Sequence, residues 1–265
     1  MTHNMFFQKV KITGKLTFHT AFHIGSGKEG ELSTHMGILL DPDGKPILPG
    51  STLKGNFRSF AERLAPYLKM TACLLDTTLS AVDCVSDEVY RKTNQDAFKR
   101  LSSERDKLNW LDVRTCDVCK LFGSPMMASR IFFSDGILVD GGDAIGIRDG
   151  VCIDRDTETA CPKAKFDYEV VPAGAVFQTT IEIENPEDDE LALIAAVVGE
   201  WENGFRLGGF SSRGLGRVTF TDKKIESVDY TKPAELIGYL VGNKMTPTLD
   251  LLTNSLESKL NRMTV

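Results

Sequence analysis

The amino-acid sequence predicts an α+β protein with a ferredoxin-like β-α-β-β-α-β core. Two segments, near residues 51–69 and 191–205, carry apolar side chains at helical spacing. Four strand-like runs surround these segments, at residues 10–18, 130–139, 175–184 and 217–220. The chain has 265 residues, of which 42% are hydrophobic, so we expect a single domain over residues 1–265 with one large core.

The first predicted strand covers residues 10–18, where apolar side chains alternate with polar ones. Its buried face comprises Val10, Ile12, Leu16 and Phe18. A loop then opens at Gly25 and runs to about residue 34. The turn residues Asp41–Gly44 follow between two short apolar runs, and this pattern predicts a hairpin-like unit.

The first helix is predicted over Ser51–Lys69, and the segment Pro49-Gly50-Ser51-Thr52 is expected to stop the preceding strand and to supply an N-cap. Lys54 and Arg58 lie four residues apart and share one face of this helix near its start. A different, apolar face comprises Leu53, Phe57, Phe60 and Leu64. Pro66 falls inside the pattern, so we expect the regular helix to kink or end there.

The remaining segments complete the core and add to it. Residues from about 70 to 125 are rich in charge and contain cysteines, and we interpret them as an insertion. The polar, glycine-containing stretch at about 145–170 predicts a protruding loop or hairpin. A strand at 175–184 and a helix at 191–205 lead into the last strand, and residues 222–265 are expected to form a helical tail.

Composition limits the classes of protein that fit. The formal net charge of -6 argues against nonspecific nucleic-acid binding, although the predicted helix at 51–69 has an excess of basic residues. The sequence has no run of about 18 apolar residues and no signal-peptide pattern at its start, so we expect a cytoplasmic protein without a membrane partner. Thiols stay reduced in that compartment, which favours metal ligands or buried thiols over disulfides.

The glycine-rich segment from Leu207 to Val218 is the strongest local signal for ligand binding. Glycines allow backbone amides to approach an anion closely, and Arg213 adds a guanidinium fork that suits phosphate. A nucleotide P-loop is excluded because Leu215 stands where the lysine is required, and a dinucleotide fingerprint is excluded because a strand follows. A tight loop and a site for a polymeric phosphate ligand both remain open.

Four of the six cysteines suggest a metal site. Cys116 and Cys119 form a Cys-x-x-Cys pair, and Cys73 and Cys84 lie upstream. Four thiolates would close a tetrahedral, structural zinc site, and the alternative is a set of buried thiols. A thioredoxin-like pair lacks the required βαβ context, and the zinc-deaminase pattern is missing. Cys152 and Cys161 are interpreted as ordinary thiols.

Three motifs in combination resemble one family. They are His23-Ile-Gly-Ser-Gly27, the segment from Ile47 to Gly55, and the segment from Gly208 to Gly216. Together they resemble the RAMP superfamily, specifically the backbone subunit of type III CRISPR effector complexes. The Cys-x-x-Cys-x-Leu-Phe-Gly run ending at Gly123 is similar to that subunit's zinc-bearing insertion, and residues 145–170 are similar to its thumb hairpin. The resemblance covers roughly residues 5–221.

The resemblance implies an RRM-like core that binds CRISPR RNA and presents it to target RNA. It also implies that copies of the chain, or related RAMP subunits, stack along the guide beside other type III effector subunits. Sequence would be read by base pairing, so the side chains would contact mainly the backbone. The RNA-binding residues it implies are Gly25, Ser51, Thr52, Lys54, Arg58, Arg148, Arg155, Lys165, Ser211, Ser212 and Arg213.

The resemblance also raises the question of catalysis. Slicing subunits of the family carry an aspartate in the loop before the first helix, where it supports metal-dependent cleavage, and His35 occupies that position here. A histidine can act as a general base near neutral pH, and Glu29 and Glu31 are alternative acids in the same loop. A divalent metal is expected only if the chain cleaves RNA.

The main hypothesis is therefore a guide-RNA-binding structural subunit. One alternative is an endoribonuclease subunit that uses the loop at residues 29–35 to cut target RNA or to process guide precursor. Another is a free-standing, zinc-stabilised RNA-binding module, which would be monomeric and would carry no repeat-derived RNA.

Overall fold

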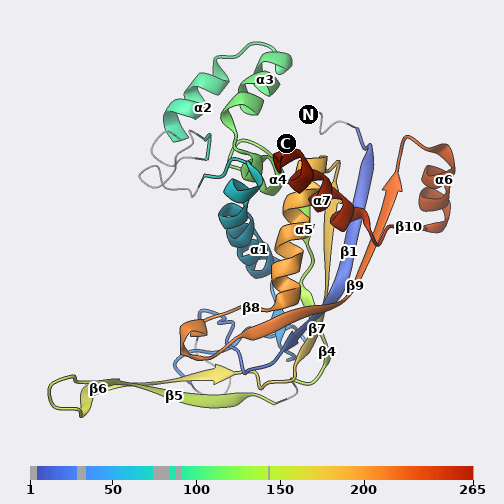
Figure 1. Cartoon of the computed structure of the whole chain (residues 1–265). Helices are drawn as coiled ribbons and strands as arrows, with labels where there is room; N and C mark the ends of the chain where they lie inside the picture. The colour runs from blue at the N-terminus through green and yellow to red at the C-terminus, as the bar shows by residue number, and fades with distance from the viewer. Residues whose placement is uncertain (1–4, 29–33, 74–83, 87–90, 143, 265) are drawn as a thin grey trace.

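The computed structural model describes residues 5–28, 34–73, 84–86, 91–142 and 144–264. Figure 1 shows a sheet with helices packed on one side and a long hairpin that extends away from the rest of the chain. The main sheet contains β1 (Gln8–Phe18), β2 (Ile47–Leu48), β3 (Ile131–Phe133), β4 (Gly136–Asp140), β7 (Val176–Glu184), β8 (Phe205–Arg206), β9 (Arg217–Asp229) and β10 (Thr246–Pro247). The hairpin consists of β5 (Gly146–Ile153) and β6 (Ala160–Val170).

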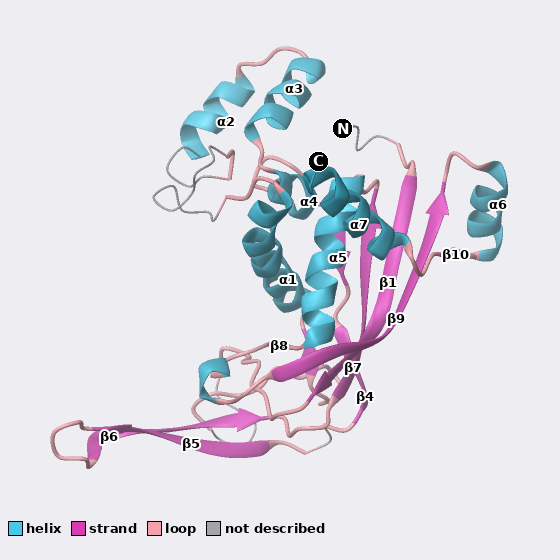
Figure 2. Cartoon of the chain, viewed as in Figure 1, coloured by secondary structure: helices cyan, strands magenta, loops and turns pink. Residues whose placement is uncertain are grey.

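The helices complete the element order. The α-helices are α1 (Gly50–Leu64), α2 (Arg91–Lys99), α3 (Glu104–Arg114), α4 (Asp117–Phe122), α5 (Asp188–Asn203), α6 (Pro233–Gly242) and α7 (Leu251–Thr264). Two 3-10 helices are η1 (Ala65–Leu68) and η2 (Ser211–Arg213). Figure 2 shows helix and strand segregated into separate layers of the main body, which is the arrangement expected of an α+β protein.

The sheet is antiparallel, with strand order β10-β9-β1-β7-β4-β2. Strand β1 lies at its centre, where Ile12 pairs with Ile181 on β7 and with Ile225 on β9. The predicted alternation of β1 is confirmed, because its predicted apolar face is fully buried. Gly14 shares that face, and a Cβ atom there would lie 2.3 Å from the ring of Phe220, so the missing side chain makes room for the aromatic ring.

Helices α1 and α5 pack together against the sheet. Trp201 on α5 is fully buried, and its ring centroid lies 5.0 Å from that of Phe57 on α1. Its indole nitrogen donates a hydrogen bond to Oδ1 of Asn56 over 3.1 Å. The helical spacing of apolar residues therefore predicted both helices and the faces that meet in the core.

The start of α1 differs from the prediction. The helix begins at Gly50, and neither Ser51 nor Thr52 caps it, because Pro49 occupies the N-cap position without a side-chain hydrogen bond. Instead Asp135, from the break between β3 and β4, accepts the Gly50 amide at 2.6 Å. A carboxylate from a distant segment thus takes the place of a local cap.

The ends of the core also differ in part from expectation. Helix α1 ends at Leu64, and Pro66 lies in the first turn of η1, as the sequence predicted. Residues 222–229 continue β9, so the region after residue 222 is not helical throughout. Helix α7 packs on α5, where Arg262 forms a 2.7 Å ion pair with Asp189.

Candidate nucleic-acid interface and metal centre

The glycine-rich segment after β8 is held tightly against the chain that follows β1. The Gly209 amide donates to the carbonyl of His23, and the Gly216 amide donates to the carbonyl of Ala21, each over 2.8 Å. Gly208 has a φ of +93°, and a Cβ atom there would lie 2.4 Å from the His23 carbonyl oxygen. These glycines therefore serve the close approach of two backbones, and these amides are used inside the molecule.

An aromatic cluster joins this segment to the base of the β5–β6 hairpin. Phe210 stacks on Tyr168 with a centroid distance of 4.3 Å and lies parallel to Phe166 at 6.3 Å. His23 is buried beside both Tyr168 and Phe210, and its Nδ1 lies 2.7 Å from the Glu169 carbonyl oxygen. Arg213, the last residue of η2, is exposed, and its guanidinium lies 5.6 Å from the Phe210 ring centroid.

The other predicted ligands near this cluster differ in exposure. Ser212 and Arg213 are exposed, whereas Ser211 is half-buried. Gly25 is exposed and pairs with Ile38 through an isolated bridge. The structure thus brings the loop after β1, the hairpin base and η2 together, and the exposed Arg213 lies at this junction.

The loop around His35 is attached to β6. The Nδ1 atom of His35 lies 2.5 Å from Oδ1 of Asp167, and the His35 amide donates to the same oxygen over 2.8 Å. These hydrogen bonds, first from the His35 amide and then from its ring, lower the pKa of Asp167. Glu29 and Glu31 lie outside the described residues.

Lys54 and Arg58 face the interior of the molecule. The Lys54 amine donates to Ser129 Oγ over 2.8 Å and to the Ile131 carbonyl over 3.3 Å. Burial, and then the nearby Arg58 charge, lower the pKa of this lysine. Arg58 forms a 2.9 Å ion pair with Glu62. Lys54 and Arg58 therefore both have internal partners, in surroundings different from those of Arg213.

The β5–β6 hairpin carries the remaining predicted ligands. Arg148, Arg155 and Lys165 are all exposed on it, and Lys165 lies 3.5 Å from Asp149 across the two strands. Figure 1 shows these strands projecting well beyond the sheet. The basic side chains are thus displayed on a protrusion whose base adjoins the aromatic cluster.

Four cysteines gather beside α4, as predicted. The Sγ atoms of Cys73, Cys84, Cys116 and Cys119 all lie within 4.8 Å of one another, and all four residues are buried. We call these four residues the cysteine cluster. Zinc–sulfur bonds of about 2.3 Å would place the sulfurs of a tetrahedron about 3.8 Å apart. This value lies between the 3.4 Å and 3.6 Å separations of Cys73 from Cys119 and Cys116 and the 4.8 Å limit that includes all four sulfurs. The cluster therefore has the donor set and the size for a metal such as zinc.

Hydrogen-bond donors surround the sulfurs of the cluster, and mutual hydrogen bonds raise the pKa of Cys73 and Cys116 while they lower the pKa of Cys84 and Cys119. The Cys119 amide donates to Cys116 Sγ over 3.4 Å, and Ser86 Oγ lies 3.1 Å from Cys119 Sγ. Hydrogen bonds from the thiols of Cys116 and Cys73 lower the pKa of Cys119 to about 7. Cys152 and Cys161 lie apart from the cluster on the hairpin, with their sulfurs 3.9 Å apart.

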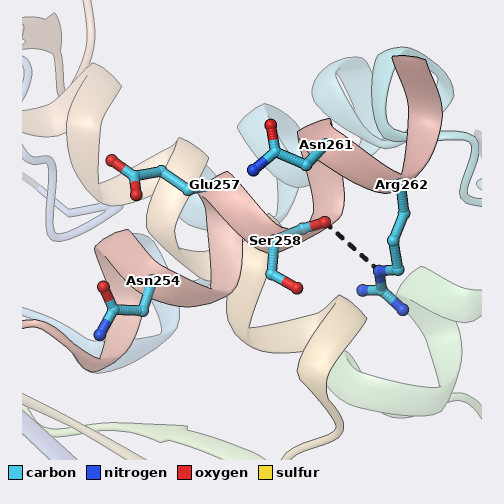
Figure 3. A pocket seen from close by; sticks show the side chains of 5 residues that line it. All are labelled: Asn254, Glu257, Ser258, Asn261 and Arg262. Carbon is cyan, nitrogen blue, oxygen red and sulfur yellow. Dashed lines mark hydrogen bonds between the residues drawn. The ribbon is translucent and has the colours of Figure 1, made fainter. Parts of the chain in front are cut away.

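A separate polar groove lies on the outer face of α7 (Figure 3). It is lined by Asn254, Glu257, Ser258, Asn261 and Arg262, and Arg262 Nε donates to the Ser258 carbonyl. None of the sequence-predicted site residues lines this groove. It is the surface of one helix and adds no group to the sites described above.

Sequence reasoning missed several residues of the junction. Phe166 and Tyr168 are two positions apart in a strand, so they project from the same face, and this spacing was the available signal. The pairing of Asp167 with His35, across 132 positions, had no comparable local signal. The stacking of Phe210 on Tyr168 likewise depends on tertiary structure alone.

Among the described residues, every helix is too short or too polar to cross a membrane.

Comparisons with known proteins agree with the sequence motifs. The chain is 25% identical to the protein named CRISPR system Cms endoribonuclease Csm3 of Streptococcus thermophilus, over 84% of this chain and 92% of that protein. It is 26% identical to the protein of the same name from Methanocaldococcus jannaschii, over 96% of this chain and 94% of that one. The Enterococcus italicus protein of this name is 24% identical over 84% of this chain.

The family comparison covers most of the core. Residues 15–219 match the model described as RAMP superfamily, a span that runs from β1 into β9 and includes α1, the cysteine cluster, the hairpin and the glycine-rich segment. The chain therefore belongs to the RAMP superfamily.

Proposed function

We propose that this chain is a CRISPR RNA-binding backbone subunit of a type III RNA-targeting interference complex. Three relatives that align with most of the chain bear the name of a CRISPR system protein, Csm3. The observation that carries the proposal is the junction of Arg213, the aromatic cluster and the hairpin base within a RAMP domain. The chain would bind CRISPR RNA and target RNA. Its protein partners would be further copies of the chain, related RAMP subunits and other effector subunits.

We propose that the RNA backbone follows the junction and the exposed basic side chains of the hairpin. Arg213 would contact phosphate, and Arg148, Arg155 and Lys165 would contact the strand along the hairpin. The hairpin would act as a thumb that separates segments of the guide. Lys54 and Arg58 are weaker candidates because their donors already have internal partners.

We propose that the core is ferredoxin-like. The order β9-β1-β7-β4 and the helices α1 and α5 support this assignment, because they place the β-α-β-β-α-β elements in one antiparallel sheet with the helices packed against it. We treat residues 1–265 as one RAMP domain with an insertion at about 70–125.

The cysteine cluster is proposed to hold structural zinc. Four buried sulfurs close to one another support this ligand set, which would leave no position open for an activated water. Bound zinc would cross-link the insertion, and the protein would contribute the four thiolates and the groups that donate hydrogen bonds to them.

A second candidate function is an endoribonuclease that uses His35. Two observations favour it: the relatives are named endoribonucleases, and the carboxylate of Asp167 is held against the His35 ring. Such a carboxylate fixes the orientation of an imidazole, as a general base requires. A divalent metal would be needed only if the cleavage chemistry is metal-dependent.

Sequencing the RNA that co-purifies with the full chain tests the main proposal. Repeat-derived guide RNA, protected in an assembly that contains several copies of the chain, is the expected result. Monomeric protein carrying unrelated RNA would support a free-standing RNA-binding module instead. Protein without any bound RNA, even when produced together with a CRISPR array and its partner subunits, would contradict the proposal.

A further inference from the structure

Arg58 contacts the cysteine cluster directly. Its Nη2 atom donates to Cys119 Sγ over 3.1 Å, and its Nη1 atom donates to the Gly123 carbonyl over 3.2 Å. Its Nε atom donates to Glu62 Oε1 over 2.9 Å, and the side chain is only 20% exposed. All three nitrogens of the guanidinium thus have partners inside the molecule, which leaves this group less available to phosphate than the exposed guanidinium of Arg213.

The sulfur of Cys119 is the focus of this network. It contacts two side-chain polar groups, the Arg58 guanidinium and the Ser86 hydroxyl, each at 3.1 Å. A sulfur held by a cation and a hydroxyl group is an environment suited to a thiolate. Four thiolates around a divalent ion carry a net charge of -2, so a guanidinium at this distance offsets part of the local negative charge.

The contacts on either side of Arg58 fix its orientation. Glu62 lies one turn further along α1, and Gly123 is the residue that ends α4. The planar fork is therefore held between the core helix and the insertion, with Cys119 in front of it. A lysine would place one charge there, but it could not reproduce this set of directed bonds.

We propose that Arg58 is an outer-shell positioning residue of the metal centre, which holds the Cys119 thiolate in its ligating orientation and locks the insertion to α1. This assignment replaces the expectation that Arg58 binds RNA, and it rests on the zinc proposed above. Its direct consequence is slower metal release from the cluster, because Cys119 cannot turn away while the guanidinium holds it.

The test measures zinc release from the full chain into a chromogenic chelator. The variants are Arg58→Gln and Arg58→Lys, with Arg63→Gln as the matched control. Arg63 lies on the same helix, donates to the Ser59 carbonyl and has its guanidinium 4.5 Å from the Phe60 ring centroid, away from the cluster. Ser86→Ala removes the other donor to Cys119 without changing the charge.

We expect Arg58→Gln to accelerate release about 10- to 100-fold, Arg58→Lys and Ser86→Ala to accelerate it less, and Arg63→Gln to match wild type. In Co²⁺-substituted protein, the sulfur-to-cobalt charge-transfer band should shift in Arg58→Gln but not in Arg63→Gln. Circular dichroism checks that each variant is folded, and Ser86→Ala still tests the network if Arg58→Gln does not fold.

Two outcomes separate this inference from the proposals on which it rests. If wild type retains one zinc per chain and Arg58→Gln releases it at the wild-type rate, the role of Arg58 is wrong while the zinc proposal stands. If wild type holds no metal after reconstitution, both fail. A loss of RNA affinity and of salt dependence in Arg58→Gln, with unchanged metal release, would make Arg58 an RNA ligand after all.

Discussion

His35 and Asp167 attach the loop that precedes α1 to the base of the β5–β6 hairpin. One oxygen of Asp167 accepts both the His35 amide, at 2.8 Å, and its Nδ1 ring atom, at 2.5 Å. The side chain of His35 is still 66% exposed, so the pair lies at the surface and not in the core. This position suits an anchor for the loop, and it also leaves the imidazole accessible to solvent.

The accessibility of His35 makes its role in RNA cleavage testable. In the assembled complex we expect His35→Ala to leave target cleavage and guide binding unchanged, because the main proposal assigns this chain a structural role. Cleavage rates are measured with and without a divalent-metal chelator, and Asp167→Asn serves as the companion variant. A loss of cutting in both variants, with intact guide binding, would instead favour the endoribonuclease.

The carboxyl group of Asp167 should titrate below its usual pKa of about 3.8, because the His35 amide and ring donate to its ionised form. A lowered pKa in the folded protein means that this interaction stabilises the fold above pH 4 and is lost as the pH falls through the lowered value. Carbon-13 NMR of the Asp167 carboxyl group measures it. His35→Ala should restore the pKa only in part, since the backbone donor remains. An unshifted wild-type titration would contradict the contact.

The sequence pattern predicted most of the core because local periodicity determines which face of an element is buried. The alternation of β1 and the helical spacing of α1 and α5 are of this kind. The end of α1 near Pro66 was predictable from a different local signal, the helix-breaking effect of proline. The cap of α1 was not predictable, because Asp135 reaches Gly50 from 85 positions away. Tertiary contacts, unlike periodicity, leave no mark in a short window of sequence.

In the candidate site, too, local sequence signals were predictive and tertiary contacts were not. The cysteine cluster was predictable because each ligand type is visible in the sequence and its spacing suits a metal. The internal hydrogen bonds of Lys54 and Arg58 were not, because the sequence places these residues on one face of a helix without revealing what covers that face. RNA binding by these two side chains, which the family resemblance implied, stays a prediction.

The glycine-rich segment offers a matched pair of substitutions. Gly208 and Gly214 both have positive φ, at +93° and +91°, but only Gly208 faces a close neighbour, the His23 carbonyl. Gly214→Ala should cost about 1–2 kcal/mol of the free energy of unfolding through backbone strain alone. Gly208→Ala should cost about 1–3 kcal/mol more, because the added methyl group collides with that carbonyl. Chemical denaturation measures both, and equal losses would contradict the proposed close approach.

Metal removal should loosen the insertion and spare the sheet. A metal bound by the four cysteines would link the segments around residues 73, 84, 116 and 119, whereas β1 is paired along its length with β7 and β9. We expect a chelator, or Cys116→Ser, to speed hydrogen exchange in α3 and α4 and to leave the β1 amides protected. Cys152→Ser is the control, since that thiol lies on the hairpin. Exchange that rises equally across the sheet would show that the metal supports the whole fold.

Arg213 provides the sharpest test of the RNA interface. Lys54 is left unchanged in this experiment because its amine bonds to Ser129 and Ile131, so its loss would disturb the core. Arg213 is exposed and lies at the junction of η2 with the hairpin base. Arg213→Gln should weaken binding of the co-purified guide RNA and lower the slope of log affinity against log salt by about 0.7, the value for one phosphate contact on single-stranded nucleic acid.

The control for Arg213 is Arg105→Gln, which makes the same charge change at an exposed position of α3. It should alter neither the affinity nor the slope. Arg213→Lys should keep the salt slope, because the charge remains, but should lose affinity if the fork over Phe210 orients the guanidinium toward phosphate. If Arg213→Gln and Arg105→Gln bind guide RNA alike at every salt concentration, the backbone does not pass η2, and the proposed RNA path along this junction is wrong.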